Sequence, residues 1–126
     1  ASEVAQVVQS MLVSVDVIYT PTDNMMASTM PTISNIAMSA AIPIVCGETN
    51  VVNKGAVGTF GMDYYKLGKL TAHQAFEILI NHKKTQDMPI EYLGENQLTL
   101  NAEVIKKLKI EVPDELIKIA KFTCTQ

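Results

Sequence analysis

The chain has 126 residues, of which 48% are hydrophobic and 18% are charged, a balance that fits one globular domain and excludes a disordered chain. The net charge is -3 and the ten basic residues are all lysines, so the basic stripe of a nucleic-acid-binding protein is missing and we expect no nucleic-acid partner. Because arginine is absent, an anion bound here must be held by backbone N–H groups, hydroxyls or lysines.

The residue types that usually carry cofactors are sparse. Cys46 and Cys124 are too far apart in sequence for a small disulfide scaffold or a zinc site, and we expect both to be free thiols. His73 and His82 are nine positions apart with no acidic residue completing a metal spacing. The glycines between residues 55 and 61 alternate with apolar residues and predict a strand, not a phosphate loop. The sequence therefore predicts no metal and no cofactor.

The first half of the chain alternates between helical and strand patterns. Apolar residues recur at intervals of three and four in the helical segments, and short apolar runs mark the strands. The predicted elements are a helix over residues 2–12, a strand over 16–20, a helix over 25–41 with a kink or restart at Pro31, a strand over 42–46, a polar loop over 47–55 and a strand over 56–60. The first two strands should be parallel, with a right-handed crossover.

The second half predicts one long helix followed by smaller elements. Asp63 can cap the long helix, which should end near Asn81 and His82 and whose apolar face comprises Leu67, Leu70, Thr71, Ala75, Ile78 and Leu79. After it, the pattern predicts short strands over residues 90–93 and 97–100, a helix capped by Asn101, and a last helix opened by Pro113 and continuing to Ala120.

This order of elements predicts an α/β fold of three layers, in which helices cover both faces of a mostly parallel sheet. The wide apolar face of the long helix has no evident partner within the chain. An exposed apolar face favours association, so a homodimer through this helix is one expected outcome.

Thr22, Asp23 and Asn24 lie between a predicted strand and a predicted helix, where open α/β sheets bind ligands. Backbone N–H groups at the start of a helix attract an anion such as a carboxylate. Thr22 and Asn24 are predicted to bind a ligand. For Asp23, ligand binding and helix capping are both open, and the two roles are compatible.

Glu48 and Asp63 are the remaining candidate binding residues. Glu48 follows the second strand, so its loop should meet the first loop over one cleft, where a carboxylate can accept hydrogen bonds from an ammonium group. A solvated loop glutamate is the alternative. Asp63 has the same ambiguity, with capping of the long helix as the favoured role.

Cys46 offers a different interpretation, an α/β enzyme with a cysteine nucleophile. His73 is the one mid-chain base available, and it falls on the polar face of its helix with no partner that would orient it. Catalysis is therefore not expected, and Cys46 fits a small buried side chain. A receiver-like domain with Asp23 as the acceptor is a third option, supported by few acidic residues.

Two runs carry a family resemblance: Asp16-Val17-Ile18-Tyr19-Thr20-Pro21-Thr22-Asp23-Asn24 and Gly61-Met62-Asp63-Tyr64-Tyr65-Lys66-Leu67-Gly68. With the strand over residues 42–45 between them, they resemble the substrate-binding proteins of ABC importers with a type I periplasmic-binding-protein fold. The resemblance extends from Ser2 to about Phe122 and is strongest between Val15 and Leu79.

The resemblance implies that the chain is the carboxyl-terminal part of a two-lobed protein. Residues 1–126 then form one incomplete domain, with a lobe core over 1–60, a segment over 61–101 that returns to the missing lobe, and carboxyl-terminal helices over 102–126. The implied function is capture of a small solute, with aromatic amino acids among the ligands of relatives, and its delivery to an ABC permease. The implied location is the outer face of the cell membrane or the periplasm, with a lipid anchor upstream of this chain.

Overall fold

The computed structural model describes residues 2–94 and 96–125, and the chain divides into two compact units. Unit 1 comprises residues 1–61 and 97–126, and unit 2 comprises residues 62–96. Among the described residues, no helix has the length and apolar character needed to cross a bilayer.

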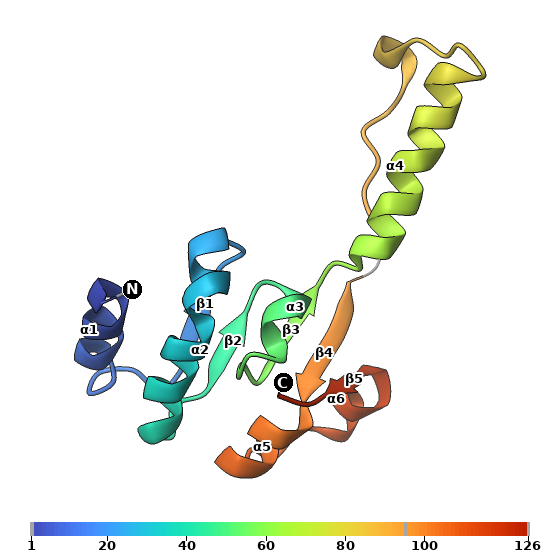
Figure 1. The fold of residues 1–126 in the computed structure, drawn as a ribbon. Helices are drawn as coiled ribbons and strands as arrows, with labels where there is room; N and C mark the ends of the chain where they lie inside the picture. Colours follow the sequence, from blue (N-terminus) through green and yellow to red (C-terminus); the bar gives the residue numbers. More distant parts are fainter. Residues whose placement is uncertain (1, 95, 126) are drawn as a thin grey trace. The chain divides into compact units, whose positions relative to one another are not determined.

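Unit 1 contains a five-stranded sheet with the spatial order β1-β2-β3-β4-β5 (Figure 1). Its elements are α1 (Ser2–Met11), β1 (Ile18–Thr20), α2 (Asn24–Ser39), β2 (Ile44–Cys46), α3 (Thr49–Val52), β3 (Gly58–Gly61), β4 (Gln97–Asn101), α5 (Ala102–Leu108), α6 (Asp114–Ile119) and β5 (Lys121–Thr123). All neighbouring strands are parallel except β3 and β4, which are antiparallel and place Gly61 opposite Gln97. The predicted α/β fold with a mostly parallel sheet is confirmed.

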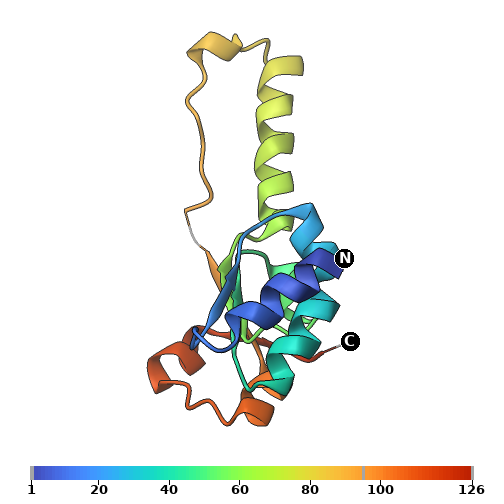
Figure 2. The same cartoon turned by 90° about the vertical axis from the view of Figure 1, so that its left-hand side faces the viewer.

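The hydrophobic core lies between one face of the sheet and the helices α1 and α2, which lie on the same side of the sheet (Figure 2). From the sheet, Ile18, Ile44 and Cys46 are buried. From α2, Met30, Ile33 and Ala37 have no exposed surface, and they recur at the helical spacing that the sequence predicted. The apolar face of each element thus follows directly from its periodicity.

The opposite face of strands β1 to β3 is apolar and exposed. Tyr19 pairs with Val45, and Phe60 stands two residues beyond Gly58, the register partner of Val45, so the three side chains share this face. Their exposed fractions are 65%, 40% and 58%. Parallel sheets are normally covered on both faces, so an exposed apolar face is unusual for an α/β domain.

Two local predictions were wrong, and one strand was missed. Residues 47–55, predicted as a loop, contain the short helix α3, whose Val51 and Val52 are buried. Residues 90–93 form no strand, which fits Pro89, because proline cannot supply the N–H that strand pairing needs. Strand β5 was not predicted, because its three residues carry no periodicity and gain their strand pairing only from β4.

The predicted restart at Pro31 was also wrong, because α2 is one helix of 16 residues that contains this proline. Pro31 has no N–H to donate to the carbonyl of Ala27, one turn earlier. The ammonium of Lys54 donates to that carbonyl instead, with an Nζ–O distance of 3.0 Å. A side chain from another segment therefore replaces the missing helical hydrogen bond.

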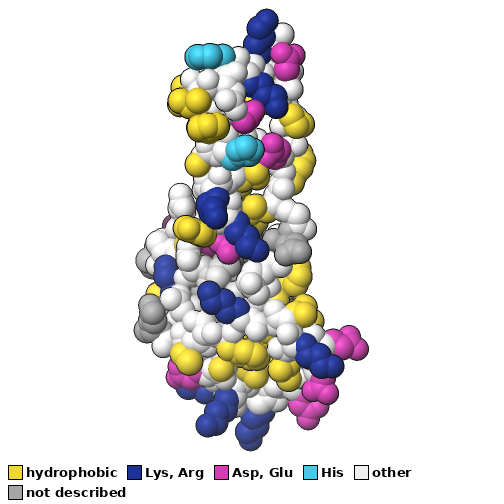
Figure 3. Space-filling view, turned by 90° about the vertical axis from the view of Figure 1, so that its right-hand side faces the viewer, with side chains coloured by type: hydrophobic (Ala, Val, Ile, Leu, Met, Phe, Trp, Pro, Cys, Tyr) yellow, Lys and Arg dark blue, Asp and Glu magenta, His cyan; other side chains and the backbone are white. Residues whose placement is uncertain are grey.

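Unit 2 consists of α4 (Tyr64–Leu79), the 3-10 helix η1 (Thr85–Asp87) and a returning segment that runs alongside α4 (Figures 1 and 2). No residue of α4 is buried, and Leu79, on the predicted apolar face, is 69% exposed. Figure 3 shows hydrophobic side chains at the surface of this unit, among lysines and acidic residues. Unit 2 therefore has no buried core of its own.

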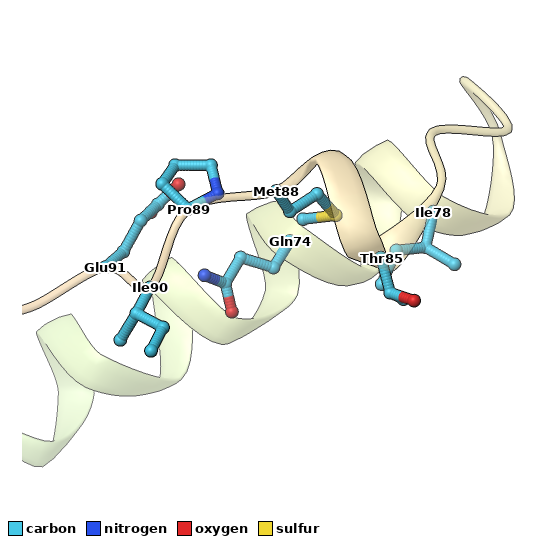
Figure 4. Close-up of a pocket in the computed structure, with 7 residues that line it drawn as sticks. All are labelled: Gln74, Ile78, Thr85, Met88, Pro89, Ile90 and Glu91. Atoms are coloured by element: carbon cyan, nitrogen blue, oxygen red, sulfur yellow. The ribbon is translucent and has the colours of Figure 1, made fainter.

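A shallow pocket of about 320 Å³ lies within unit 2, between α4 and the returning segment (Figure 4). Its lining is mainly apolar on the returning side and mixed on the helix, and comprises Gln74, Ile78, Thr85, Met88, Pro89, Ile90 and Glu91. Ile90 is 80% exposed although it lines the pocket, so the returning segment packs only loosely on α4.

Candidate functional site

The loops that follow β1 and β2 are in direct contact. Thr20 and Cys46, the last residues of the two strands, are register partners, and the backbone N–H of Gly47 donates to the carbonyl of Thr20 at 2.9 Å. The hydroxyl of Thr22 donates to the carbonyl of Gly47 at 3.1 Å. The two predicted binding loops therefore meet at the carboxyl ends of two parallel strands, where α/β sheets bind ligands.

Gly47 is required for this contact. A Cβ atom at position 47 would lie 2.8 Å from the hydroxyl of Thr22 and 3.2 Å from the hydroxyl of Tyr19. Any larger residue would push the two loops apart. Gly47 thus belongs to the candidate site and was missed from the sequence, where a glycine after a strand gives no sign of which segment approaches it.

Asp23 caps α2, which was one of its two predicted roles. Its Oδ1 atom accepts a hydrogen bond from the N–H of Met26 at 3.0 Å, and its backbone is extended, as in a typical N-cap. Asn24 is the first residue of the helix and is exposed. A helix of 16 residues begins here, so its positive end faces the region beside Thr22.

Glu48 occupies the N-cap position of α3 but makes no side-chain cap hydrogen bond. One carboxylate oxygen accepts from the side-chain amide of Asn50 at 3.2 Å. Glu48 is half-buried and follows Gly47 directly, so its carboxylate belongs to the loop that contacts Thr22. The structure thus brings together Thr22, Asp23, Asn24 and Glu48 within unit 1.

Asp63 belongs to unit 2. Its Oδ1 atom accepts from the N–H groups of Tyr65 at 2.9 Å and Lys66 at 3.2 Å, so it caps α4, the favoured role. A ligand-binding role for Asp63 remains a prediction.

Three buried threonine hydroxyls lie in or beside the strands β1 to β3. Within residues 2–94 and 96–125, the hydroxyl oxygens of Thr20, Thr49 and Thr59 are buried and have no hydrogen-bond partner. Thr20 ends β1, and Thr49 begins α3 directly after Glu48. No sequence pattern singled them out, because a threonine in or beside a strand is usual.

Cys46 has the environment of a core residue. It is 2% exposed, and its sulfur contacts the backbone carbonyls of Glu48 at 3.3 Å and Gly58 at 3.7 Å. Burial raises the pKa of the Cys46 thiol, with a smaller contribution from the nearby Glu48 carboxylate. A nucleophilic cysteine needs the opposite shift, so this geometry disfavours the enzyme alternative.

We expect the two cysteines to react very differently with iodoacetamide at pH 8. Cys124 is exposed and should be alkylated within minutes, whereas Cys46 should react only after unfolding. Because the pKa of the Cys46 thiol is raised in the folded state, the protonated thiol stabilises the folded protein relative to the unfolded chain. This stabilisation is lost as the pH rises above 9.0, the ordinary pKa of the thiol. Mass spectrometry of native and denatured samples measures both thiols, and rapid native labelling of Cys46 would restore the enzyme alternative.

No group of three His, Cys, Asp or Glu side chains that could hold a metal ion occurs in the described part of the chain. The polar groups at the strand ends are hydroxyls, carboxylates and backbone N–H groups. This set suits a small polar organic molecule that carries both charges, such as a zwitterion.

Comparison with known proteins places this chain in a family. The family model of the ABC transporter substrate binding protein matches residues 1–123. A tyrosine-binding protein of Clostridioides difficile (strain R20291) is 37% identical over 111 residues, which are 88% of this chain and 32% of that protein. The chain therefore spans about a third of the length of this curated relative.

Solved structures agree in fold. A ligand-free, open substrate-binding protein with adhesive properties from Clostridium difficile is similar over 99% of this chain and 41% of its own, with a TM-score of 0.81 and 35% identity. An ABC domain from Streptococcus pneumoniae in complex with L-Trp has a TM-score of 0.84 and 28% identity, over 96% of this chain and 41% of its own. The chain belongs to the ABC transporter substrate-binding protein family.

Proposed function

We propose that this chain is the carboxyl-terminal part of the solute-binding component of an ABC importer, with an amino acid as its ligand and aromatic amino acids as the first candidates. The observation that carries the proposal is the contact between the Thr22 loop and the Gly47 loop at the ends of two parallel strands. The tyrosine-binding relative and the structure with L-Trp support the ligand class. The family is one of binding proteins, which supports a function without catalysis.

The site residues suggest how each end of an amino acid would be held. The ligand carboxylate would lie at the positive end of α2, near the Thr22 hydroxyl and Asn24, since no arginine is available. The ligand ammonium would pair with the carboxylate of Glu48 or Asp23. For Asp63, which lies in unit 2, a ligand-binding role is proposed separately from the loops of unit 1.

The rest of the cleft would come from a part of the longer protein outside this chain. Unit 2 has no buried residue in α4, and the sheet face around Tyr19 and Phe60 is exposed, so both surfaces need a cover. The solved relatives are more than twice as long as the matched region, since this chain covers 41% of each. We propose that residues 1–60 are a lobe core, that the segment 61–101 reaches a second lobe before β4 rejoins the sheet of unit 1, and that 102–126 are carboxyl-terminal helices of this chain. Alternatively, a second copy of the chain would bury the exposed face of α4 in a homodimer.

The partners follow from this assignment. The loaded protein would deliver its solute to an ABC permease on the outer face of the cell membrane or in the periplasm, held there by a lipid anchor upstream of this chain. Family membership supports this location.

Ligand-induced thermal stabilisation of the full-length protein tests the proposal. With L-tyrosine or L-tryptophan at about 100 times the dissociation constant, binding should stabilise the folded state by about 2.7 kcal/mol and raise the melting temperature. Thr22→Val and Glu48→Gln should weaken binding by removing a hydroxyl and a charge from the joined loops. Thr32→Val, an exposed position in α2 outside the site, is the matched control and should bind as the parent does.

The panel should include all amino acids and several nucleotides. Stabilisation by a non-aromatic amino acid would keep the importer function and change the ligand. A shift with nucleotides alone would contradict the proposed ligand class.

A further inference from the structure

We infer that Lys54 is a positioning residue of the binding site: it locks the first turns of α2 to the α3 segment by replacing the helical hydrogen bond that Pro31 removes. The inference rests on the proposed function for its effect on ligand binding. Its structural part is independent of which ligand the site takes.

The first observation is that Lys54 donates to the one carbonyl of α2 that Pro31 leaves without its helical donor. In an α-helix the N–H of residue 31 would donate to the carbonyl of residue 27, and Pro31 has no N–H. The Lys54 ammonium donates to that very carbonyl at 3.0 Å, across 27 positions of sequence. The hydrogen bond is exposed to solvent, and it gives the Ala27 carbonyl a donor in place of the missing amide.

The second observation is the close packing of the next residue. Gly55 has a φ of 111°, and a Cβ atom there would lie 2.5 Å from the Cβ of Ser34. Ser34 lies in the turn of α2 that follows Pro31 and donates its hydroxyl to the carbonyl of Pro31 at 3.1 Å. Residues 54 and 55 therefore contact α2 on both sides of the proline.

The third observation connects this contact to the binding loops. The segment that ends at Lys54 begins at Gly47 and Glu48, and its helix α3 contains only four residues. At its start it is tied to the α2 side by the Thr22–Gly47 hydrogen bond, and at its end by the Lys54–Ala27 hydrogen bond. Two ties separated by one short helix fix the loop with Glu48 relative to the loop with Asp23.

This arrangement makes Pro31 and Lys54 a coupled pair. With proline at position 31, the Lys54 hydrogen bond satisfies the Ala27 carbonyl and holds the loops. With an ordinary residue at position 31, the helix satisfies the same carbonyl without help, so Lys54 loses much of its effect. If Lys54 were a surface lysine without this role, its substitution would have the same effect with proline or with alanine at position 31.

The test is a double-mutant cycle in the full-length protein with the variants Lys54→Met, Pro31→Ala and the double variant, with Lys54→Arg as the conservative substitution. Lys106→Met, an exposed lysine of α5, is the matched control. Melting temperature, hydrogen exchange of the amides of residues 26–30 and affinity for L-tyrosine are measured for each.

We expect Lys54→Met to lower the melting temperature, accelerate amide exchange in the first turns of α2 and weaken L-tyrosine binding about fivefold, as the loss of one hydrogen bond implies. Lys54→Arg should retain the parental values. In the Pro31→Ala background, Lys54→Met should change binding less than about twofold.

Equal effects of Lys54→Met in both backgrounds would overturn the inference, as would unchanged affinity despite a lower melting temperature. If the parent protein binds no amino acid, the proposed function fails on its own. The exchange and melting data then still decide whether Lys54 compensates for Pro31.

Discussion

Replacing Asn101 with alanine should lower the free energy of unfolding by about 3 kcal/mol, since it removes a helix cap worth about 1 kcal/mol and leaves buried groups unpaired at about 1–3 kcal/mol. Asn101 has no exposed surface. Its Oδ1 atom accepts from the N–H groups of Glu103 and Val104, and its Nδ2 donates to the carbonyl of Val52 at 2.9 Å. One side chain thereby joins β4, α5 and α3.

Urea unfolding of the full-length protein and its Asn101→Ala variant measures this loss. Thr125→Val serves as the matched control, because it removes a single partner of Asn101, at 3.1 Å, near the surface. The control should cost less than about 1 kcal/mol. A similarly small loss for Asn101→Ala would show that the hydrogen bonds of Asn101 contribute little to the free energy of unfolding.

Gly55→Ala should destabilise the protein by about 3 kcal/mol, because backbone strain and overpacking each cost about 1–3 kcal/mol. The φ of 111° is one that residues with a Cβ atom rarely adopt, and the new methyl group would lie 2.5 Å from the Cβ of Ser34. The same change should also disturb Lys54, its neighbour in sequence. Thermal and urea unfolding give the loss in stability.

The two causes can be separated with Ser34→Gly, which removes the atoms that the new methyl group would strike. Gly55→Ala in the Ser34→Gly background should lose about half of its effect, with the remainder due to backbone strain. Full recovery in that background would mean that the φ angle itself costs nothing.

Much of the fold could be predicted because unit 1 follows elementary rules. The apolar face of α2 appears in the spacing of Met30, Ile33 and Ala37, and the runs that end at Thr20 and Cys46 are short apolar segments bounded by polar residues. The caps at Asp23, Asp63 and Asn101 are residue types with oxygen acceptors at helix starts, and all three make the expected hydrogen bonds.

The features that escaped prediction depend on contacts distant in sequence. Strand β5 has three residues and is a strand only because β4 pairs with it. Lys54 donates to the carbonyl of Ala27, which Pro31 leaves without its helical donor, and no local pattern indicates this long-range contact. Helix α3 is too short to show a helical period.

In the candidate site, too, the residues could be predicted but their arrangement could not. Thr22, Asp23, Asn24 and Glu48 could be proposed because strand ends are visible in the sequence. Their juxtaposition depends on the parallel pairing of β1 with β2 and on the close approach at Gly47, which only the three-dimensional structure reveals. Their roles in ligand binding stay predictions that the thermal-shift panel tests.

The pairing of Gly61 with Gln97 has a consequence for how the protein is built. The chain leaves unit 1 at one of these residues and re-enters at the other, and the two are opposite each other on adjacent antiparallel strands. Residues 62–96 therefore occupy the place of a hairpin loop, and a two-residue turn between the same strands would close the sheet without them. Unit 2 is in this sense an insertion between β3 and β4, and a change in its length would leave the register of these two strands as it is.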